Sequence, residues 1–137
     1  MEKPELRAKV VIDNPWEDLV LSLLSVNQYS LKRTYESIES LRDVGIFDPE
    51  NISRWAQSEF IACLTAGGCD RGTFMTNLFA LRLAHLGALI QRKGIDACTK
   101  IISGRDGEAI EELLMPVNGI GPKVIANFFL LREIPRK

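Results

Sequence analysis

Cysteine and histidine are scarce in this sequence of 137 residues, which holds three cysteines and one histidine. An odd number of cysteines argues against a framework of disulfides, and a lone histidine without metal-ligand spacing argues against a zinc site. We therefore expect Cys63, Cys69 and Cys98 to be buried, inert thiols, because an unpaired cysteine packs as a small apolar side chain. No residue is predicted as a metal ligand.

Long apolar runs and an excess of positive charge are missing as well. No apolar stretch approaches the roughly 20 residues of a membrane span, and the start, Met1-Glu2-Lys3-Pro4, does not have the pattern of a signal peptide. We expect a cytoplasmic protein that is neither secreted nor membrane-bound. The formal net charge of −1 at pH 7 counts against a tight nucleic-acid binder, because neutralisation of phosphates supplies much of that affinity.

Strand signals are also missing, since we find no convincing run of alternating apolar and polar residues and no Asn-Gly hairpin. Apolar residues instead recur at helical spacing, which predicts one all-α domain over residues 1–137. The expected helices cover about 30–45, 49–55, 58–66, 73–93 and 95–102. Asp70 or Thr73 is the expected N-cap of the long helix. Its predicted buried face is formed by Phe74, Leu78, Leu81 and Leu89.

The first helix has a clear start in Asn14-Pro15-Trp16-Glu17. Asn14 is the predicted N-cap, Pro15 takes the first helical position, and Glu17 reaches back as in a capping box. Apolar residues follow at helical spacing, namely Trp16, Leu19, Val20, Leu23 and Leu24. The helix then runs into the segment Leu24-Ser25-Val26-Asn27-Gln28-Tyr29-Ser30.

The most informative stretch is Val117-Asn118-Gly119-Ile120-Gly121-Pro122-Lys123. Gly119 and Gly121 allow a positive φ, and Pro122 suits the first turn of a helix. The free N–H groups and the positive dipole end of such a helix favour an anion such as a phosphate. Upstream, the spacing of Ala109, Ile110, Leu113 and Leu114 indicates the buried face of a preceding helix. We therefore predict a helix, a tight hairpin and a helix over about 106–132.

The first helix with residues 24–30, and the hairpin of residues 117–123, resemble segments of the base-excision DNA glycosylases that carry a helix-hairpin-helix motif. This superfamily includes endonuclease III. The family's hairpin reads approximately Leu-Pro-Gly-apolar-Gly-x-Lys-Thr-Ala, and Gly119, Ile120, Gly121 and Lys123 stand at comparable positions. Val117-Asn118 replaces Leu-Pro, and Val124 replaces Thr. The family's first helix similarly begins with Asn-Pro-aromatic-Glu and ends in Leu-Ser-x-Gln-x-Thr/Ser.

The resemblance implies an all-helical fold of the DNA-glycosylase type and a role in base-excision repair. Such a protein recognises a damaged base or an abasic site in double-stranded DNA, with the target nucleotide flipped out of the helix. The implied chemistry is that of an N-glycosylase and AP lyase, with Lys123 forming a Schiff base at the sugar C1′. In a prokaryote the protein would be associated with the nucleoid.

The resemblance also implies roles in DNA binding. Gln28 corresponds to the glutamine that fills the space left by the flipped nucleotide, with Asn27 as the alternative position. Tyr29 is the candidate wedge or stacking residue. Arg71 is the candidate phosphate contact, in the glycine-rich turn Gly67-Gly68-Cys69-Asp70-Arg71-Gly72. A phosphate would be held by the amides of Gly119, Ile120 and Gly121.

Two features of the family are missing from these residues. The catalytic aspartate would fall beyond Lys137, so we expect the protein to continue past this residue. The alternative is a protein that ends here and is catalytically impaired. Glu133 is a poor replacement for this aspartate, because it would lie about 15 Å from Lys123 along the helix axis. Asp70 is the other candidate replacement. The iron–sulfur cluster of several family members needs four cysteines after the catalytic domain, whereas all three cysteines here precede the hairpin. No cofactor is therefore predicted.

Other interpretations stay open. Lys123 is also compatible with a phosphate contact or with a plain surface position. A non-catalytic module would use the hairpin for sequence-independent phosphate contacts, and a helical protein-interaction domain would carry a fortuitous Gly-x-Gly turn. The basic residues could either share one DNA-facing surface or be scattered over the surface as solvated charges. The residues concerned are Lys32, Arg33, Arg71, Lys123, Arg132, Arg136 and Lys137.

Overall fold

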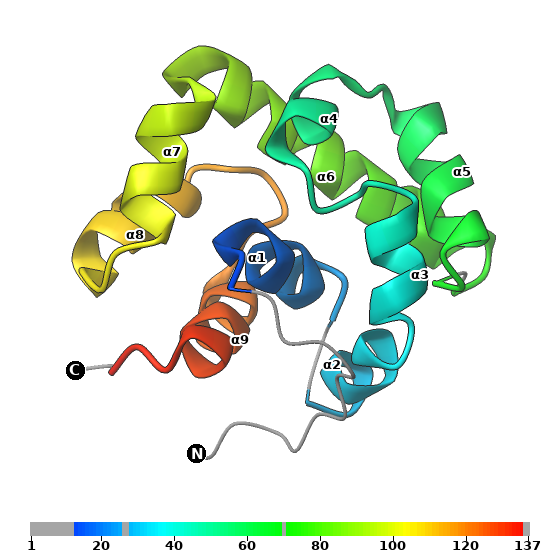
Figure 1. Ribbon diagram of the computed structural model, residues 1–137, viewed down its shortest axis with the longest axis horizontal. Coiled ribbons are helices and arrows are strands. Elements are labelled where there is room, and N and C mark those ends of the chain that lie inside the picture. Colours follow the sequence, from blue (N-terminus) through cyan, green and yellow to red (C-terminus); the bar gives the residue numbers. More distant parts are fainter. Residues whose placement is uncertain (1–12, 26–27, 70, 136–137) are drawn as a thin grey trace.

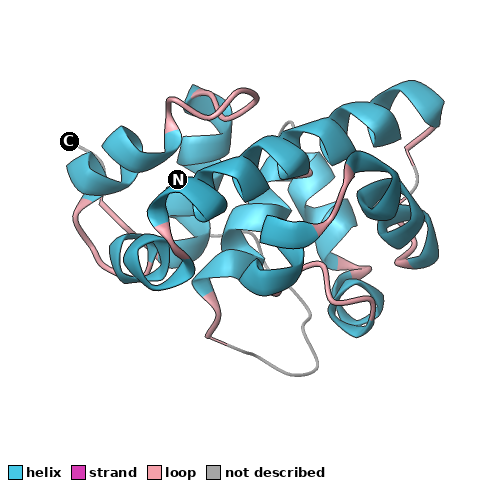
Figure 2. Cartoon of the chain, turned by 90° about the horizontal axis from the view of Figure 1, so that it is seen from above, coloured by secondary structure: helices cyan, strands magenta, loops and turns pink. Residues whose placement is uncertain are grey.

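The computed structural model describes residues 13–25, 28–69 and 71–135, and of residues 28–31 it describes the backbone only. In this part of the chain there are nine helices and no strand, with 72% helix, which confirms the predicted all-α class. Short loops join the helices (Figure 2). The helices are α1 (Pro15–Leu23), α2 (Gln28–Tyr35), α3 (Ile38–Asp43), α4 (Pro49–Arg54), α5 (Gln57–Ala66), α6 (Thr73–Lys93), α7 (Ile95–Ile102), α8 (Gly107–Leu114) and α9 (Pro122–Arg132).

Helix α1 lies at the centre of the molecule (Figure 1). It packs against α2, α6, α7 and α9, and it packs most extensively against α9. The long helix α6 packs against α4 and α5, while α3 packs against α5 and α8 packs against both α7 and α9. Through its contacts with α6 and α9, α1 links the helices packed on α6, which are α4 and α5, to the pair formed by α8 and α9.

The start of α1 is as predicted. Asn14 is the N-cap, with its side chain accepting a hydrogen bond of 3.1 Å from the backbone N–H of Trp16, and Pro15 occupies the first turn. Trp16 is buried and donates from Nε1 to the Thr99 hydroxyl of α7 at 2.9 Å. The apolar residues predicted for this helix, Leu19 and Leu23 among them, all lie in the core.

The predicted capping box at Glu17 is wrong. The Glu17 carboxylate is buried, and it pairs in a bidentate way with Arg42 of α3, at 2.6 Å from Nε to Oε1 and 3.0 Å from Nη2 to Oε2. The hydrogen bond to Glu17 raises the pKa of Arg42. A buried carboxylate is stabilised more by a guanidinium than by a backbone N–H, because the guanidinium carries a full positive charge.

The single helix predicted over 30–45 is two helices. The chain turns between α2 and α3, where the Ser37 N–H donates to the Thr34 carbonyl at 3.0 Å, a three-residue step that tightens the helical turn. Ser37 is the N-cap position of α3, and Ile38 starts a new buried face. Gly45, with a φ of 81°, lies just past the end of α3, close to the predicted end.

Helix α6 spans the predicted residues, but its buried face differs from the prediction. Phe74 is 77% exposed and Leu81 is also exposed, whereas Leu89 is buried. The side chains that face the core are Thr76, Phe79, Ala80, Leu83, Leu86, Leu89 and Ile90. A helix that is apolar on more than one side offers two candidate stripes, and packing against α4 and α5 selects one of them.

Two further details of α6 differ from expectation. Gly72 is the N-cap and Thr73 is the first helical residue, so Thr73 does not cap the helix; Asp70, the alternative cap, lies outside the described residues. By length and composition alone, α6 could also cross a membrane, and 44% of its most apolar window is buried inside the protein. Arg82 and His85 interrupt this apolar run in the sequence. Core helices of soluble proteins pass the same test, so the finding is weak evidence.

The three cysteines are free, with Cys69 and Cys98 buried and Cys63 half-buried. Burial raises the pKa of the Cys63 and Cys98 thiols. A protonated thiol is a poor nucleophile, so these two positions agree with the expectation of inert thiols.

Candidate functional site

The predicted helix, hairpin and helix are present. Asp106 is the N-cap of α8 and accepts a hydrogen bond of 3.2 Å from the Ala109 N–H. Two successive tight turns then reverse the chain: Val117 N–H donates to the Leu114 carbonyl at 2.9 Å, and Ile120 N–H donates to the Val117 carbonyl at 3.0 Å. Pro122 opens α9, as predicted.

The two hairpin glycines have different conformations. Gly119 has a φ of 100°, a region that side chains with a Cβ rarely adopt. Gly121 has a φ of −114°, so it does not use the freedom for a positive φ that a glycine has. Gly121 is instead the N-cap of α9. With no side chain, it leaves the first N–H groups of α9 without a side-chain cap.

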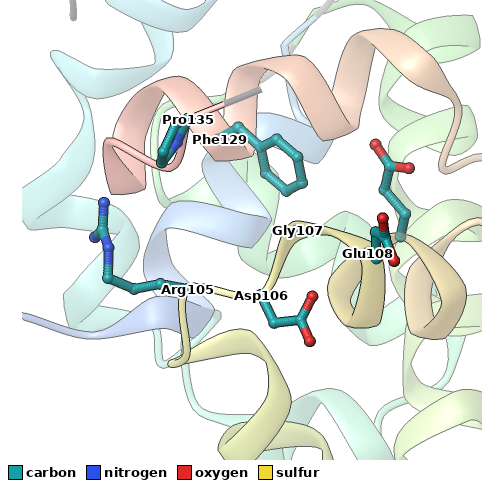
Figure 3. A pocket seen from close by; sticks show the side chains of 7 residues that line it. Arg105, Asp106, Gly107, Glu108, Phe129 and Pro135 are labelled. Atoms are coloured by element: carbon teal, nitrogen blue, oxygen red, sulfur yellow. The ribbon is translucent and has the colours of Figure 1, made fainter. Parts of the chain in front are cut away.

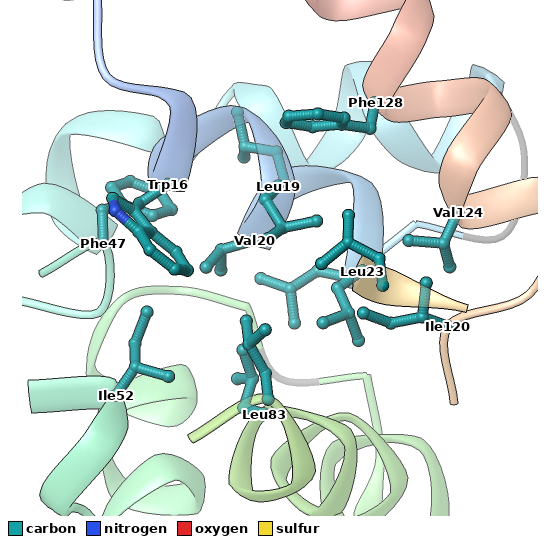
Figure 4. Close-up of a cluster of buried hydrophobic side chains, with 14 of the residues drawn as sticks. Trp16, Leu19, Val20, Leu23, Phe47, Ile52, Leu83, Ile120, Val124 and Phe128 are labelled. Atoms are coloured by element: carbon teal, nitrogen blue, oxygen red, sulfur yellow. The ribbon is translucent and has the colours of Figure 1, made fainter. Parts of the chain in front are cut away.

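The apolar residues of the hairpin hold it against the core. Ile120 and Val124 are buried in the same cluster as Leu23 of α1 (Figure 4). The side chain of Ile120 therefore anchors the hairpin, and any contact of this residue with a ligand would be made by its backbone. This packing fixes the orientation of the first turn of α9.

A cleft of about 610 Å³ opens beside the hairpin. Its lining comes from three elements that are far apart in the sequence: the end of α1, the middle of α6 and the start of α9. The lining residues are Ser25, Arg82, Gly119, Ile120, Gly121, Pro122, Lys123 and Val124. The cleft thus joins the end of the Asn-Pro helix to the hairpin, the two segments that carry the resemblance.

Lys123 lies in the first turn of α9, on the lining of this cleft, and its side chain is exposed. The Lys123 amine is therefore accessible to solvent in the free protein. Among the lining residues there is no aspartate or glutamate. Glu133 terminates α9 at its far end, where it is exposed.

The other predicted site residues are not brought together here. Arg71 does not line the cleft, and its backbone N–H donates to the Thr76 hydroxyl at 3.1 Å. One guanidinium nitrogen of Arg71 is buried without a hydrogen-bond partner among the described residues. The side chains of Gln28 and Tyr29 lie outside the described part of the chain; their backbone forms the first turn of α2.

The predicted basic surface loses one of its members. Arg132 is mostly buried and pairs with Asp13 at 2.7 Å and with Asp18 at 3.2 Å, so its charge is neutralised within the protein. Lys32 and Arg33 are exposed on α2. Arg136 and Lys137 lie outside the described residues.

Two residues of this region were not predicted from the sequence. Arg82 lines the cleft from α6, and the only sequence signal for it is a charge between Leu81 and Leu83 in an otherwise apolar segment. Asn127 lies one turn after Lys123 and is 8% exposed, and its Nδ2 has no hydrogen-bond partner in the described residues. Nothing in the sequence pattern marks this buried donor.

A second cavity, of about 540 Å³, lies between the start of α8 and the end of α9 (Figure 3). Three carboxylates line it, from Asp106, Glu108 and Glu111, together with a single guanidinium, that of Arg105. The Arg105 guanidinium donates to backbone carbonyls at the end of α9. This acidic lining repels phosphate, so the hairpin cleft is the better candidate for a nucleic acid.

Among the described residues, no group of three or more histidine, cysteine, aspartate or glutamate side chains could hold a metal ion. No protein-family model, curated protein or solved structure matches this chain.

Proposed function

We propose that this protein has a fold of the DNA-glycosylase type and acts in base-excision repair, recognising a damaged base or an abasic site in duplex DNA. The proposed chemistry is that of an N-glycosylase and AP lyase, with Lys123 as the nucleophile. The observation that carries the proposal is the shared cleft, in which the end of the Asn-Pro helix meets the hairpin and its lysine. Ser25 of the first motif and the residues of the hairpin motif thus line one space.

The cleft suits a nucleotide that has left the DNA helix. Its volume of about 610 Å³ lies in the range of roughly 300–1,000 Å³ that is usual for small-molecule sites. The uncapped start of α9 offers N–H groups and a positive dipole end to a phosphate. Lys123 lies in the same turn, so a bound backbone would bring a sugar close to its amine.

In the proposed reaction the unprotonated Nζ of Lys123 attacks C1′ of the deoxyribose. The bond between C1′ and the base breaks, and the base leaves with the electron pair and takes up a proton. The C1′–O4′ bond then breaks while the nitrogen lone pair forms the C1′=N bond, and the remaining amine proton passes to O4′, which gives a Schiff base and a 4′-hydroxyl. At an existing abasic site the amine condenses with the C1′ aldehyde, and water leaves. The exposed amine would lose its water only when DNA closes the cleft.

A second candidate is a DNA-binding module without catalytic activity. It is favoured by the absence of a carboxylate among the cleft residues, since nothing there could accept a proton from the Lys123 ammonium. In that case the hairpin amides and Lys123 would contact phosphates without reading the sequence. The two candidates differ in whether a covalent bond forms.

The test is reductive trapping with borohydride on a duplex that contains a single abasic site. The wild-type chain is compared with Lys123→Ala and with Lys100→Ala, a control that removes an exposed lysine from α7, away from the cleft. We expect a covalent adduct with the wild type and with Lys100→Ala, and none with Lys123→Ala. The reason is that borohydride reduces only the imine, which requires the amine at C1′.

The alternatives give different results. If the wild type binds the duplex in a salt-dependent way but forms no adduct, the lyase chemistry is excluded for these residues and the binding module is supported. If Lys123→Ala is trapped as well as the wild type, another amine reacts and the assignment of Lys123 is wrong. A chain with no salt-dependent affinity for DNA would agree with a protein-interaction domain.

A further inference from the structure

Arg82 approaches the hairpin very closely. A Cβ placed on Gly119 would lie 2.3 Å from Cγ and 3.0 Å from Cδ of Arg82, so the aliphatic part of this side chain occupies the space that Gly119 leaves empty. Its guanidinium carbon lies 6.0 Å from the centroid of the Phe79 ring on the preceding turn of α6. The hairpin and the phenyl ring thus hold the Arg82 side chain from two sides.

The charge of Arg82 is not neutralised by the described part of the chain. Two other partly buried arginines have carboxylate partners, Glu17 for Arg42 and Asp13 and Asp18 for Arg132. For the Arg82 guanidinium, no hydrogen bond or ion pair is found among the described residues. Arg82 is half-buried on the wall of the cleft. A guanidinium without a carboxylate partner can donate charge-assisted hydrogen bonds to an anionic ligand.

The surroundings of Arg82 specify the kind of ligand. The cleft residues carry two positive charges, Arg82 from α6 and Lys123 from α9, and no negative charge. A guanidinium presents two parallel N–H donors that match the oxygens of a phosphate, whereas an ammonium acts as a point charge. The cleft therefore has one group suited to grip a phosphodiester and a second group, Lys123, that can react with an adjoining sugar.

We propose that Arg82 binds a backbone phosphate of the DNA strand next to the nucleotide that Lys123 attacks. This inference rests on the function proposed above and names the residue that holds the strand in the cleft. Gly119 is part of the arrangement, since a side chain at this position would displace the Arg82 stem from the hairpin. The phosphate is then held between the guanidinium of α6 and the N–H groups that start α9.

The test measures binding to a duplex with a tetrahydrofuran abasic analogue, which lacks an aldehyde and cannot react with an amine. Affinities of the wild type, Arg82→Met and Arg82→Lys are determined by fluorescence anisotropy from about 50 to about 200 mM KCl. Methionine keeps most of the apolar stem and removes the charge. The control is Arg92→Met, which removes an exposed arginine from the last turn of the same helix.

We expect Arg82→Met to weaken binding about tenfold at the lower salt concentration and to reduce the slope of log K against log salt by about 0.9, the value for one lost phosphate contact. Arg82→Lys should keep the slope, because the charge remains, and lose affinity through the missing second donor. Arg92→Met should leave both quantities unchanged. Thermal unfolding of each variant shows whether a loss of affinity comes from unfolding.

The outcomes separate the two proposals. If the wild type has no affinity for the duplex, the proposed function and the role of Arg82 are both wrong. If the wild type binds and folded Arg82→Met shows the wild-type slope, only the role of Arg82 is overturned. A reduced slope for Arg82→Met, with an unchanged slope for Arg92→Met, supports a phosphate contact at Arg82.

Discussion

The carboxylate of Glu17 is a charged group inside the core, and it depends on one partner. The side chains of Glu17 and Arg42 are 5% and 16% exposed, and two hydrogen bonds join them. A charge left alone in such a place is destabilising, because it keeps neither water nor a counterion. The ion pair of Glu50 and Arg54 on α4 differs in being solvated, since its side chains are 61% and 72% exposed.

We predict that Arg42→Met lowers the free energy of unfolding by about 3 kcal/mol, since it leaves the Glu17 carboxylate buried and unpaired. The control Arg54→Met should change the free energy of unfolding by less than about 1 kcal/mol, because its pair is solvated. Urea unfolding at neutral pH measures both. The double variant Glu17→Gln with Arg42→Met should lose less than the sum of the single variants. Equal losses for Arg42→Met and Arg54→Met would contradict the argument from burial.

At the scale of the element, the hairpin depends on its two glycines for different reasons. Gly119 combines a φ of 100° with the close approach of Arg82. Gly121 has an ordinary extended conformation, and a Cβ there would meet nothing within 4 Å. The two positions therefore form a matched pair of substitutions within one turn.

We predict that Gly119→Ala lowers the free energy of unfolding by about 2 kcal/mol, because alanine is strained at positive φ and its Cβ displaces the Arg82 stem. Gly121→Ala should cost less than about 1 kcal/mol, the difference expected between glycine and alanine at an N-cap. Chemical denaturation measures the stabilities, and anisotropy with the abasic duplex measures the affinities. A larger loss of stability for Gly121→Ala than for Gly119→Ala would refute this account of the turn.

At the scale of the whole molecule, the long helix α6 organises one half of the fold through a close contact with α4. A Cβ on Gly87 would lie 2.2 Å from the carbonyl oxygen of Ile52, so the two backbones meet where α6 has no side chain. Gly87 is buried, whereas its neighbour Ala88 is exposed. The contact determines how closely α4 approaches α6.

We predict that Gly87→Ala lowers the free energy of unfolding by about 2 kcal/mol through overpacking against α4. In an isolated helix this substitution stabilises by up to about 1 kcal/mol, so the sign of the effect is the test. The control Ala88→Gly on the exposed side should cost about 1 kcal/mol by helix propensity alone. Thermal and urea unfolding of the two variants provide the comparison. An increase in stability for Gly87→Ala would show that α4 and α6 move apart at no cost.

The charges are also distributed at the scale of the whole molecule. The net charge of −1 does not show how the charges are placed: the charged residues of the hairpin cleft are both cations, whereas three of the four charged residues of the second cavity are carboxylates. The sequence predicted only some of the residues that line the cleft. The hairpin and Lys123 follow a local pattern of residues, whereas Arg82 and Ser25 reach the same space only because α1 packs against both α6 and α9.

Local sequence signals are enough to predict where most of the described helices begin and end. Asn14-Pro15, Asp48-Pro49 and Pro122 mark helix starts, and Gly67 and Gly94 mark ends, because caps and turns act within a few residues along the chain.

Three features follow from the packing of the helices instead: which face of α6 is buried, the pairing of Glu17 with Arg42, and the contact of Arg82 with Gly119. These outcomes depend on residues far apart in the sequence, and packing and charge neutralisation select among arrangements that local propensity leaves equivalent.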